Sequence, residues 1–179
     1  MGQSKQLLPI NGKPLLQKTI EELVAANTGD VIIVLGANAE AHKKVISHSP
    51  AYIIENDQWE NGMGSSIKLG LEFIKDKIPE AAGVIISVCD QPYLNQSHIQ
   101  AIVTTYLKSK KTIVASGYNN TTGVPALFDQ SHFPALTQIE DKEGAKKVIH
   151  EHFSKVITVP FPLGAIDLDT KEDYDTFNQ

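Results

Sequence analysis

The sequence predicts an α/β fold, in which a mostly parallel sheet lies between layers of helices. Short apolar runs of strand length alternate, almost throughout the chain, with stretches in which apolar residues recur at helical spacing. Such alternation is typical of right-handed βαβ units, which place parallel strands side by side and helices on the sheet faces. The 179 residues contain no linker, internal repeat or low-complexity tract. We therefore expect a single domain over residues 1–179.

The first half of the chain predicts three helices and two strands. The first helix follows Pro14, carries an apolar stripe, and ends at Asn27 and Gly29, which are typical helix-ending residues. Gly36 closes the first strand, and a polar, glycine-punctuated segment (residues 55–66) precedes the third helix. The predicted elements are helix 15–24, strand 31–35, helix 40–46, strand 52–54 and helix 67–78.

The second half continues the alternation. Asn95 is a plausible cap for a helix whose buried stripe runs from Ile99 to Leu107. Residues 118–123 are expected to form a loop, and Pro125 favours an extended conformation after it. The predicted elements are strand 84–88, helix 96–107, strand 112–115, extended segment 124–128, helix 145–153, strand 156–159 and a final helix that holds Tyr174 and Phe177.

The stretch from Val84 to Leu94 is the most informative one. A run this apolar is typical of a strand buried on both faces, and Pro92 ends its ladder because proline has no backbone N–H. Asp90 then lies at the carboxyl end of a central strand, where open α/β sheets bind their ligands. A carboxylate there can hold a divalent cation against phosphate oxygens, or it can simply cap the following loop. Spacing alone does not decide between the two.

Composition and charge exclude several classes of protein. Hydrophobic residues make up 41% of the chain, the net charge is −5, and no block of Lys and Arg occurs, so we expect no nucleic-acid or membrane partner. The apolar runs are too short to span a bilayer, and no signal peptide opens the chain, so we expect a cytoplasmic protein. The single cysteine, Cys89, lies in the apolar run and is interpreted as a core residue.

Three further groups of polar residues are candidates for a site. Lys5 precedes the first helix and can attract phosphates as a point charge, although a solvated lysine is the simpler interpretation. The segment from Gly62 to Ser66 opens a helix, so its N–H groups and hydroxyls can bind an anion, or a serine can merely cap the helix. Asp167 and Asp169 flank one residue and point the same way in an extended segment. They can complete a metal site with Asp90, but a helix cap is the favoured interpretation on spacing alone.

Taken together, these positions resemble the molybdenum cofactor nucleotidyltransferases, the MobA-like family, and most closely its cytidylyltransferase branch. The resemblance runs in the family's order across nearly the whole chain. Its pieces are Met-Gly-x-x-Lys-x-Leu-Leu-Pro at residues 1–9, Gly-Lys-Pro-Leu-Leu at 12–16, Asn-x-x-Trp-x-x-Gly-Met-x-Ser-Ser at 56–66, Asp-Gln-Pro at 90–92, Gly-x-Pro-x-Leu-Phe at 123–128, Gly-Ala at 144–145 and Asp-Leu-Asp-Thr-x-x-Asp at 167–173.

The resemblance implies a three-layer, Rossmann-like nucleotidyltransferase fold related to the GT-A glycosyltransferases. It also implies Mg²⁺-dependent transfer of CMP from CTP, favoured over GTP, to molybdopterin with release of pyrophosphate. Lys5 matches the lysine that contacts the triphosphate, and Asp90 matches the metal-binding acid. The other matching positions are the nucleotide-binding Gly62, Gly64, Ser65 and Ser66, and the pair Asp167 and Asp169, expected to help hold the metal or substrate.

One piece of the family pattern is absent. Family members begin with a buried strand and a loop, Leu-Ala-Ala-Gly-x-Ser-x-Arg, immediately before the Met-Gly that stands here at residues 1–2. With the first strand missing, we expect a gap in the sheet, with unpaired backbone groups and exposed apolar side chains. Because that loop supplies backbone amides and an arginine to the nucleotide, this chain is expected to bind nucleotide weakly and turn over poorly. A late start or a truncation is favoured over a degenerate relative, since the downstream residues remain.

Two alternative functions stay open. The first is a nucleotidyltransferase that acts on another phosphorylated acceptor, since sugar-phosphate and methylerythritol-phosphate transferases share this architecture. The second is a non-catalytic protein that binds the cofactor and delivers it to a molybdoenzyme. The missing loop favours the second alternative, whereas Lys5, Asp90 and the Asp167/Asp169 pair favour an enzyme.

Overall fold

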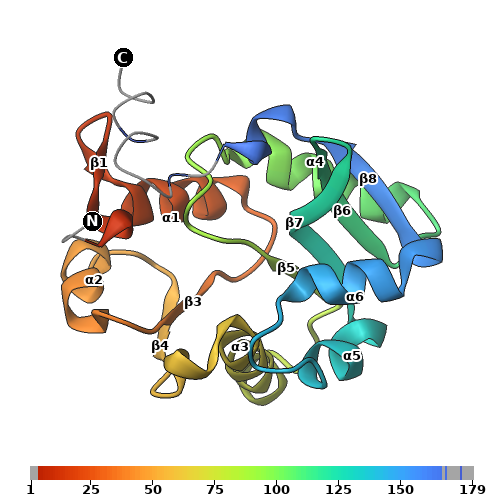
Figure 1. Ribbon diagram of the computed structural model, residues 1–179, viewed down its shortest axis with the longest axis horizontal. Helices are drawn as coiled ribbons and strands as arrows, with labels where there is room; N and C mark the ends of the chain where they lie inside the picture. Colours follow the sequence, from red (N-terminus) through yellow and green to blue (C-terminus); the bar gives the residue numbers. More distant parts are fainter. Residues whose placement is uncertain (1–3, 167, 169–173, 175–179) are drawn as a thin grey trace.

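The computed structural model describes residues 4–166, 168 and 174, and these form an α/β fold with helices on both sides of the strands (Figure 1). The strands are β1 (Pro9–Ile10), β2 (Lys13–Pro14), β3 (Ile32–Leu35), β4 (Tyr52–Glu55), β5 (Gly83–Ile86), β6 (Ile113–Tyr118), β7 (Thr121–Asp129) and β8 (Val156–Pro160). The α-helices are α1 (Leu15–Ala26), α2 (Ala39–Ile46), α3 (Met63–Lys77), α4 (Gln96–Lys108), α5 (Phe133–Thr137) and α6 (Ala145–Glu151). The α/β prediction is confirmed.

The larger sheet is mixed, with the strand order β5–β7–β6–β8. Strand β7 runs antiparallel to both β5 and β6, whereas β6 and β8 are parallel. The antiparallel strand arises because residues 118–123, predicted as a loop, form a tight hairpin between β6 and β7. Its two central residues, Asn119 and Asn120, have φ angles of 47° and 56°, the left-handed conformation that two-residue hairpin turns need and that asparagine tolerates.

Strands β3 and β4 form a separate parallel pair. Among the described residues, β5 pairs along one edge only, with β7. The prediction that residues 84–88 are buried on both faces is wrong, because all of them are only partly buried. We attribute the partial exposure to the unpaired edge of β5, which leaves its apolar side chains incompletely covered.

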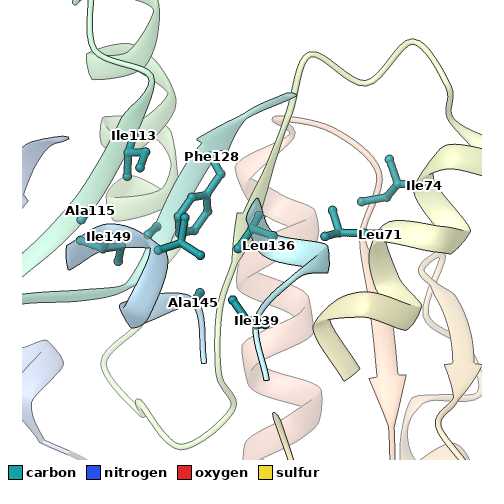
Figure 2. Packing of buried hydrophobic residues seen from close by; sticks show 11 residues of the cluster. Leu71, Ile74, Ile113, Ala115, Phe128, Leu136, Ile139, Ala145 and Ile149 are labelled. Carbon is teal, nitrogen blue, oxygen red and sulfur yellow. The ribbon is translucent and has the colours of Figure 1, made fainter. Parts of the chain in front are cut away.

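The core is divided by the larger sheet into two layers of contacts. On one face, alternate residues of β6 and β7 pack against α3, α5 and α6, and Figure 2 shows Phe128 and Leu136 between α3 and α6. On the other face, Val114 and Leu127 pack against Ile102 of α4. This alternation follows from the strand period of two. Helix α1 covers β3 through Leu16 and Ile20, and Figure 1 shows it on the same side as α4.

Two details of the helices differ from the sequence prediction. Helix α3 begins at Met63, four residues before the predicted start, so Gly64, Ser65 and Ser66 belong to its first turn. Leu107 was expected in the buried stripe of α4 but is 75% exposed. It is the penultimate residue of α4, where the helix has little left to pack against.

None of the helices in the described part of the chain could cross a membrane. The longest, α3, has 15 residues and carries five charged side chains, whereas a spanning helix needs about 20 mostly apolar residues.

A buried histidine links α4 to the sheet. His98 Nε2 lies 2.7 Å from Ser116 Oγ, and Ser116 Oγ donates its proton to the Pro125 carbonyl at 2.6 Å. The serine has one proton, so Nε2 must donate to it. The His98 ring stacks on the ring of Phe161, and the two ring centroids are 4.2 Å apart. Burial lowers the pKa of His98 below its usual value, because the charged form would lose its hydration.

We therefore expect the protein to lose stability in mild acid. Below the ordinary histidine pKa of about 6.5 the unfolded chain binds protons that folded His98 does not, so the free energy of unfolding falls as the pH drops. His42 and His132, whose pKa values are also lowered by burial, act in the same direction. Urea unfolding at pH 7.5 and 5.5 measures the effect. The His98→Gln variant can keep the bond to Ser116 without titrating, and it should show a smaller loss; equal losses would contradict the assignment.

Candidate active site

Asp90 and two residues near the candidate site follow the ends of strands. Gly36 follows β3, Asn56 follows β4, and Asp90 follows β5 by four residues. The carboxyl ends of parallel strands lie at one edge of a sheet, and ligands of open α/β sheets bind there. The predicted position of Asp90 beyond the end of a strand is therefore confirmed, although the strand ends earlier than the proline suggests.

The structure brings Lys5 and Asp90 into direct contact, across 85 positions of sequence. Lys5 Nζ lies 3.3 Å from Asp90 Oδ2, and the two side chains are 30% and 28% exposed. Lys5 stands in a 3₁₀ turn, Lys5–Leu7, that precedes the β1–β2 hairpin and α1. An ammonium and a carboxylate thus face one another at a partly open site, where each can still meet a ligand.

One oxygen of Asp90 has no partner among the residues that the structure describes. Among the described residues, Asp90 Oδ1 is buried and accepts no hydrogen bond. A buried carboxylate oxygen without a donor is costly, and a divalent cation is a suitable partner because Mg²⁺ prefers carboxylate oxygens. The residue therefore fits the metal-binding role that the sequence suggested. No cluster of three or more potential metal ligands of the His, Cys, Asp and Glu types occurs in the described part of the chain.

The predicted partners of Asp90 in a metal site, Asp167 and Asp169, lie outside the described residues. Leu168 between them is described: it is fully buried, and its N–H donates to the Asp90 carbonyl oxygen at 3.0 Å. Leu168 is thereby tied to the backbone of Asp90.

Gln91 is a buried polar residue of the matched Asp-Gln-Pro motif, and sequence reasoning assigned it no role. It is 3% exposed, and its Nε2 donates to the Gly164 carbonyl at 2.8 Å and to the Val124 carbonyl at 3.3 Å. These bonds tie the loop of Asp90 to the end of the sheet and to the 3₁₀ turn Pro162–Ala165. On the other side Lys18 of α1 donates to the Pro92 carbonyl. The loop of Asp90 is therefore hydrogen-bonded to α1 through Pro92, and to β7 and the 3₁₀ turn through Gln91.

The hydroxyls of Ser65 and Ser66 are organised by Asn56, which is 6% exposed. Asn56 Nδ2 donates to Ser65 Oγ at 2.8 Å and to Ser66 Oγ at 3.0 Å. Ser65 Oγ also lies 2.7 Å from the Gly62 carbonyl, to which it can donate its own proton. Ser66 Oγ donates to no acceptor within the described part of the chain. Of the two predicted serines, Ser66 thus has the hydroxyl proton that a ligand could use.

The two glycines of this segment pack against the backbone of residues 140–142. A Cβ on Gly62 would lie 2.3 Å from the Asp141 carbonyl oxygen, and one on Gly64 would lie 2.3 Å from the Glu140 carbonyl oxygen. The Gly64 N–H donates to the Asp141 carbonyl at 2.8 Å, so this amide is engaged within the protein. Lys68 of α3 adds an ion pair to Asp141 at 2.7 Å. The glycines thus permit close approach of two segments, and sequence alone did not reveal that contact.

Cys89, adjacent to Asp90, behaves as a core residue. Burial, together with the neighbouring Asp90 carboxylate, raises the pKa of its thiol to about 11. The thiolate that nucleophilic catalysis requires is therefore scarce at neutral pH. This agrees with the interpretation from the sequence.

Known proteins share similarity with nearly the whole chain. Residues 1–156 match the family described as the MobA-like NTP transferase domain. Nicotine blue oxidoreductase of Paenarthrobacter nicotinovorans is 25% identical over 182 residues, covering 98% of this chain and 85% of that protein. The purine catabolism protein PucB of Bacillus subtilis is 23% identical over 188 residues, covering 98% of this chain and 88% of that protein.

Solved structures show the same fold. The manganese complex of Rv0371c from Mycobacterium tuberculosis superposes with a TM-score of 0.79 at 22% identity, covering 98% of this chain and 92% of that one. Molybdopterin-guanine dinucleotide biosynthesis protein A from Archaeoglobus fulgidus superposes with a TM-score of 0.65 at 14% identity, covering 98% and 89%. The Rossmann-like nucleotidyltransferase fold predicted from the sequence is confirmed.

Proposed function

This chain belongs to the MobA-like NTP transferase family, and from that premise we propose that it transfers CMP from CTP to molybdopterin and releases pyrophosphate. The observation that carries the proposal is the Lys5–Asp90 pair, in which a buried Asp90 oxygen accepts no hydrogen bond from the described residues. We further propose that Mg²⁺ is the metal and that the cytoplasm, which holds the CTP pool, is the site of action.

The reaction needs positioning and charge neutralisation rather than a protein nucleophile. A phosphate oxygen of the acceptor bonds to the α-phosphorus of CTP, and the bond from that phosphorus to the bridging oxygen of the β-phosphate breaks. Both reactants are anions, so their approach requires nearby positive charge. Lys5 supplies such a charge at the site, and the absence of an activated thiol at Cys89 agrees with a direct transfer.

Asp90 would hold the divalent cation, with Asp167 and Asp169 as further proposed ligands. When bound, the cation would neutralise phosphate charge and polarise the phosphorus centre. Ser66, whose hydroxyl is oriented by Asn56, and the first turn of α3 would contact the nucleotide together with Gly62, Gly64 and Ser65. The manganese complex of Rv0371c supports a divalent metal on this fold.

The choice of molybdopterin as acceptor and of cytosine as nucleobase rests on the resemblance of motifs rather than on contacts in the structure. The name of the Archaeoglobus protein refers to molybdopterin-guanine dinucleotide, which supports a molybdopterin acceptor. The preference for CTP follows from the branch whose motifs the chain matches.

A transfer assay tests the proposal. The chain is incubated with molybdopterin, Mg²⁺ and α-³²P-labelled CTP or GTP, and the labelled dinucleotide and pyrophosphate are quantified. We expect label to enter the product from CTP, with one pyrophosphate released per transfer and only a low turnover. Transfer from GTP alone would show that the nucleobase preference is for guanine and not for cytosine. Binding of molybdopterin without any transfer would favour the delivery alternative and contradict the enzyme.

A further inference from the structure

A buried histidine of α2 reaches the segment that carries Lys5. His42 is 6% exposed, and its Nε2 lies 2.7 Å from the hydroxyl oxygen of Ser4, the residue that directly precedes Lys5. Figure 1 shows α2 beside the N-terminal part of the chain. The contact joins residues 38 positions apart, so it fixes one segment against another.

The direction of this hydrogen bond follows from the proton count. Ser4 Oγ donates to Gln6 Oε1 at 2.6 Å, and a hydroxyl has only one proton to give. Ser4 Oγ must therefore accept from His42, whose neutral ring carries its proton on Nε2. Burial lowers the pKa of His42, which keeps the ring neutral near pH 7.

The backbone hydrogen bonds within the turn are local. Leu7 N–H donates to the Ser4 carbonyl at 3.0 Å, and Leu8 N–H donates to the Lys5 carbonyl at 3.1 Å. Such bonds maintain the shape of a 3₁₀ turn, but they do not set where the turn lies relative to the sheet. The bond from His42 sets the position of the turn relative to the strands, because α2 is packed on β3 through Ile46.

We infer that His42 is a positioning residue for nucleotide binding, which holds the Lys5 turn through Ser4 so that the ammonium group stays opposite Asp90. The inference rests on the proposed function, in which Lys5 contacts the triphosphate. A lysine ammonium is a flexible point charge, so its contribution depends on how well the backbone that carries it is placed. His42 touches neither Lys5 nor Asp90 in the described contacts, and it acts through Ser4.

Calorimetric titration of Mg·CTP into matched variants tests the inference. His42→Leu and Ser4→Ala each remove the bond, and each is expected to weaken binding about fivefold, the factor that corresponds to a net contribution of ~1 kcal/mol from one hydrogen bond. His42→Gln can present an amide N–H near the position of Nε2 and should restore most of the affinity. The double variant should bind no more weakly than either single one.

Controls separate positioning from general damage. His48→Leu replaces an exposed histidine two residues beyond the end of α2 and should leave affinity unchanged. Thermal unfolding is recorded for every variant, and Ser4→Ala tests the bond without altering the core. Hydrogen exchange of the amides of residues 5–8 gives a readout without nucleotide: it should accelerate in His42→Leu and recover in His42→Gln.

The possible failures are distinguishable. Wild-type affinity for Mg·CTP in both His42→Leu and Ser4→Ala, with affinity lost in Lys5→Ala, would overturn the inference and leave the proposed function standing. If the wild-type chain binds neither Mg·CTP nor Mg·GTP, the proposed function fails, and His42 then has no role in nucleotide binding even where exchange shows that it orders the turn.

Discussion

Asp90→Asn is expected to lower kcat/KM for nucleotidyl transfer by roughly 10²- to 10³-fold, the range found when a charge-stabilising group is removed from an active site. The substitution keeps the shape of the side chain but removes the negative charge that would hold a divalent cation. It also removes the charged partner that lies 3.3 Å from Lys5 Nζ. Steady-state rates with CTP and saturating Mg²⁺ measure the effect, and Mn²⁺ binding followed by paramagnetic resonance should weaken in parallel.

Asp30→Asn is the matched control for this prediction. Asp30 is exposed and stands two residues before β3, away from the carboxyl ends of the strands. The same loss of one negative charge there should leave both the rate and the Mn²⁺ affinity unchanged. If Asp90→Asn binds Mn²⁺ and Mg·CTP as the wild type does, Asp90 only caps its loop, which is the alternative that spacing left open.

The Lys5–Asp90 contact shows how far sequence reasoning reaches in this protein. Each residue was selected separately, Asp90 because it follows an apolar strand and Lys5 because it precedes the first helix. Their meeting depends on tertiary structure, because the β1–β2 hairpin separates Lys5 from α1 and 85 sequence positions separate it from Asp90. The metal role of Asp167 and Asp169 stays a prediction, as does the single domain over residues 1–179.

The wrong predictions about strand burial and strand direction have a common physical cause. Both properties depend on partner strands that are distant in the sequence. The apolar run at residues 84–88 indicates a strand but not how many of its edges are paired, and β5 pairs along one edge in the described part. The hairpin at Asn119 and Asn120 reverses the chain within two residues, so β7 runs antiparallel to β5 and β6 in a sheet that was expected to be mostly parallel. Local patterns define elements better than they define neighbours.

The same cause explains why supporting residues were missed. Asn56, Gln91 and His42 are ordinary polar residues in the sequence, and only burial with defined partners reveals their roles. Two signals were available in principle: Asn56 directly follows β4 and opens the matched motif at residues 56–66, and Gln91 directly follows Asp90. His42 gives no such signal, because its partner Ser4 lies on a different element.

Gly62→Ala is expected to destabilise the protein by about 2–5 kcal/mol, the sum of a strained backbone and an overpacked contact. Gly62 has φ 129° and ψ 179°, a conformation that residues with a Cβ rarely adopt. The added methyl group would lie 2.3 Å from the Asp141 carbonyl oxygen and 2.9 Å from Lys142 Cα, so the segment that opens α3 must move away from residues 140–142. Urea unfolding measures the loss.

Gly12→Ala isolates the backbone contribution, because Gly12 has φ 82° but no heavy atom within 4 Å of the position of an added Cβ. It should cost only about 1–2 kcal/mol. The difference between the two variants then reports the lost close approach together with the more strained backbone of Gly62, and an equal cost would show that residues 140–142 move to admit the methyl group. Because the first turn of α3 carries Ser65 and Ser66, Gly62→Ala should also weaken Mg·CTP binding in the fraction that remains folded, whereas Gly12→Ala should weaken it less. A folded Gly62→Ala variant with wild-type affinity would remove this segment from the proposed nucleotide site and leave the Lys5–Asp90 pair to account for binding.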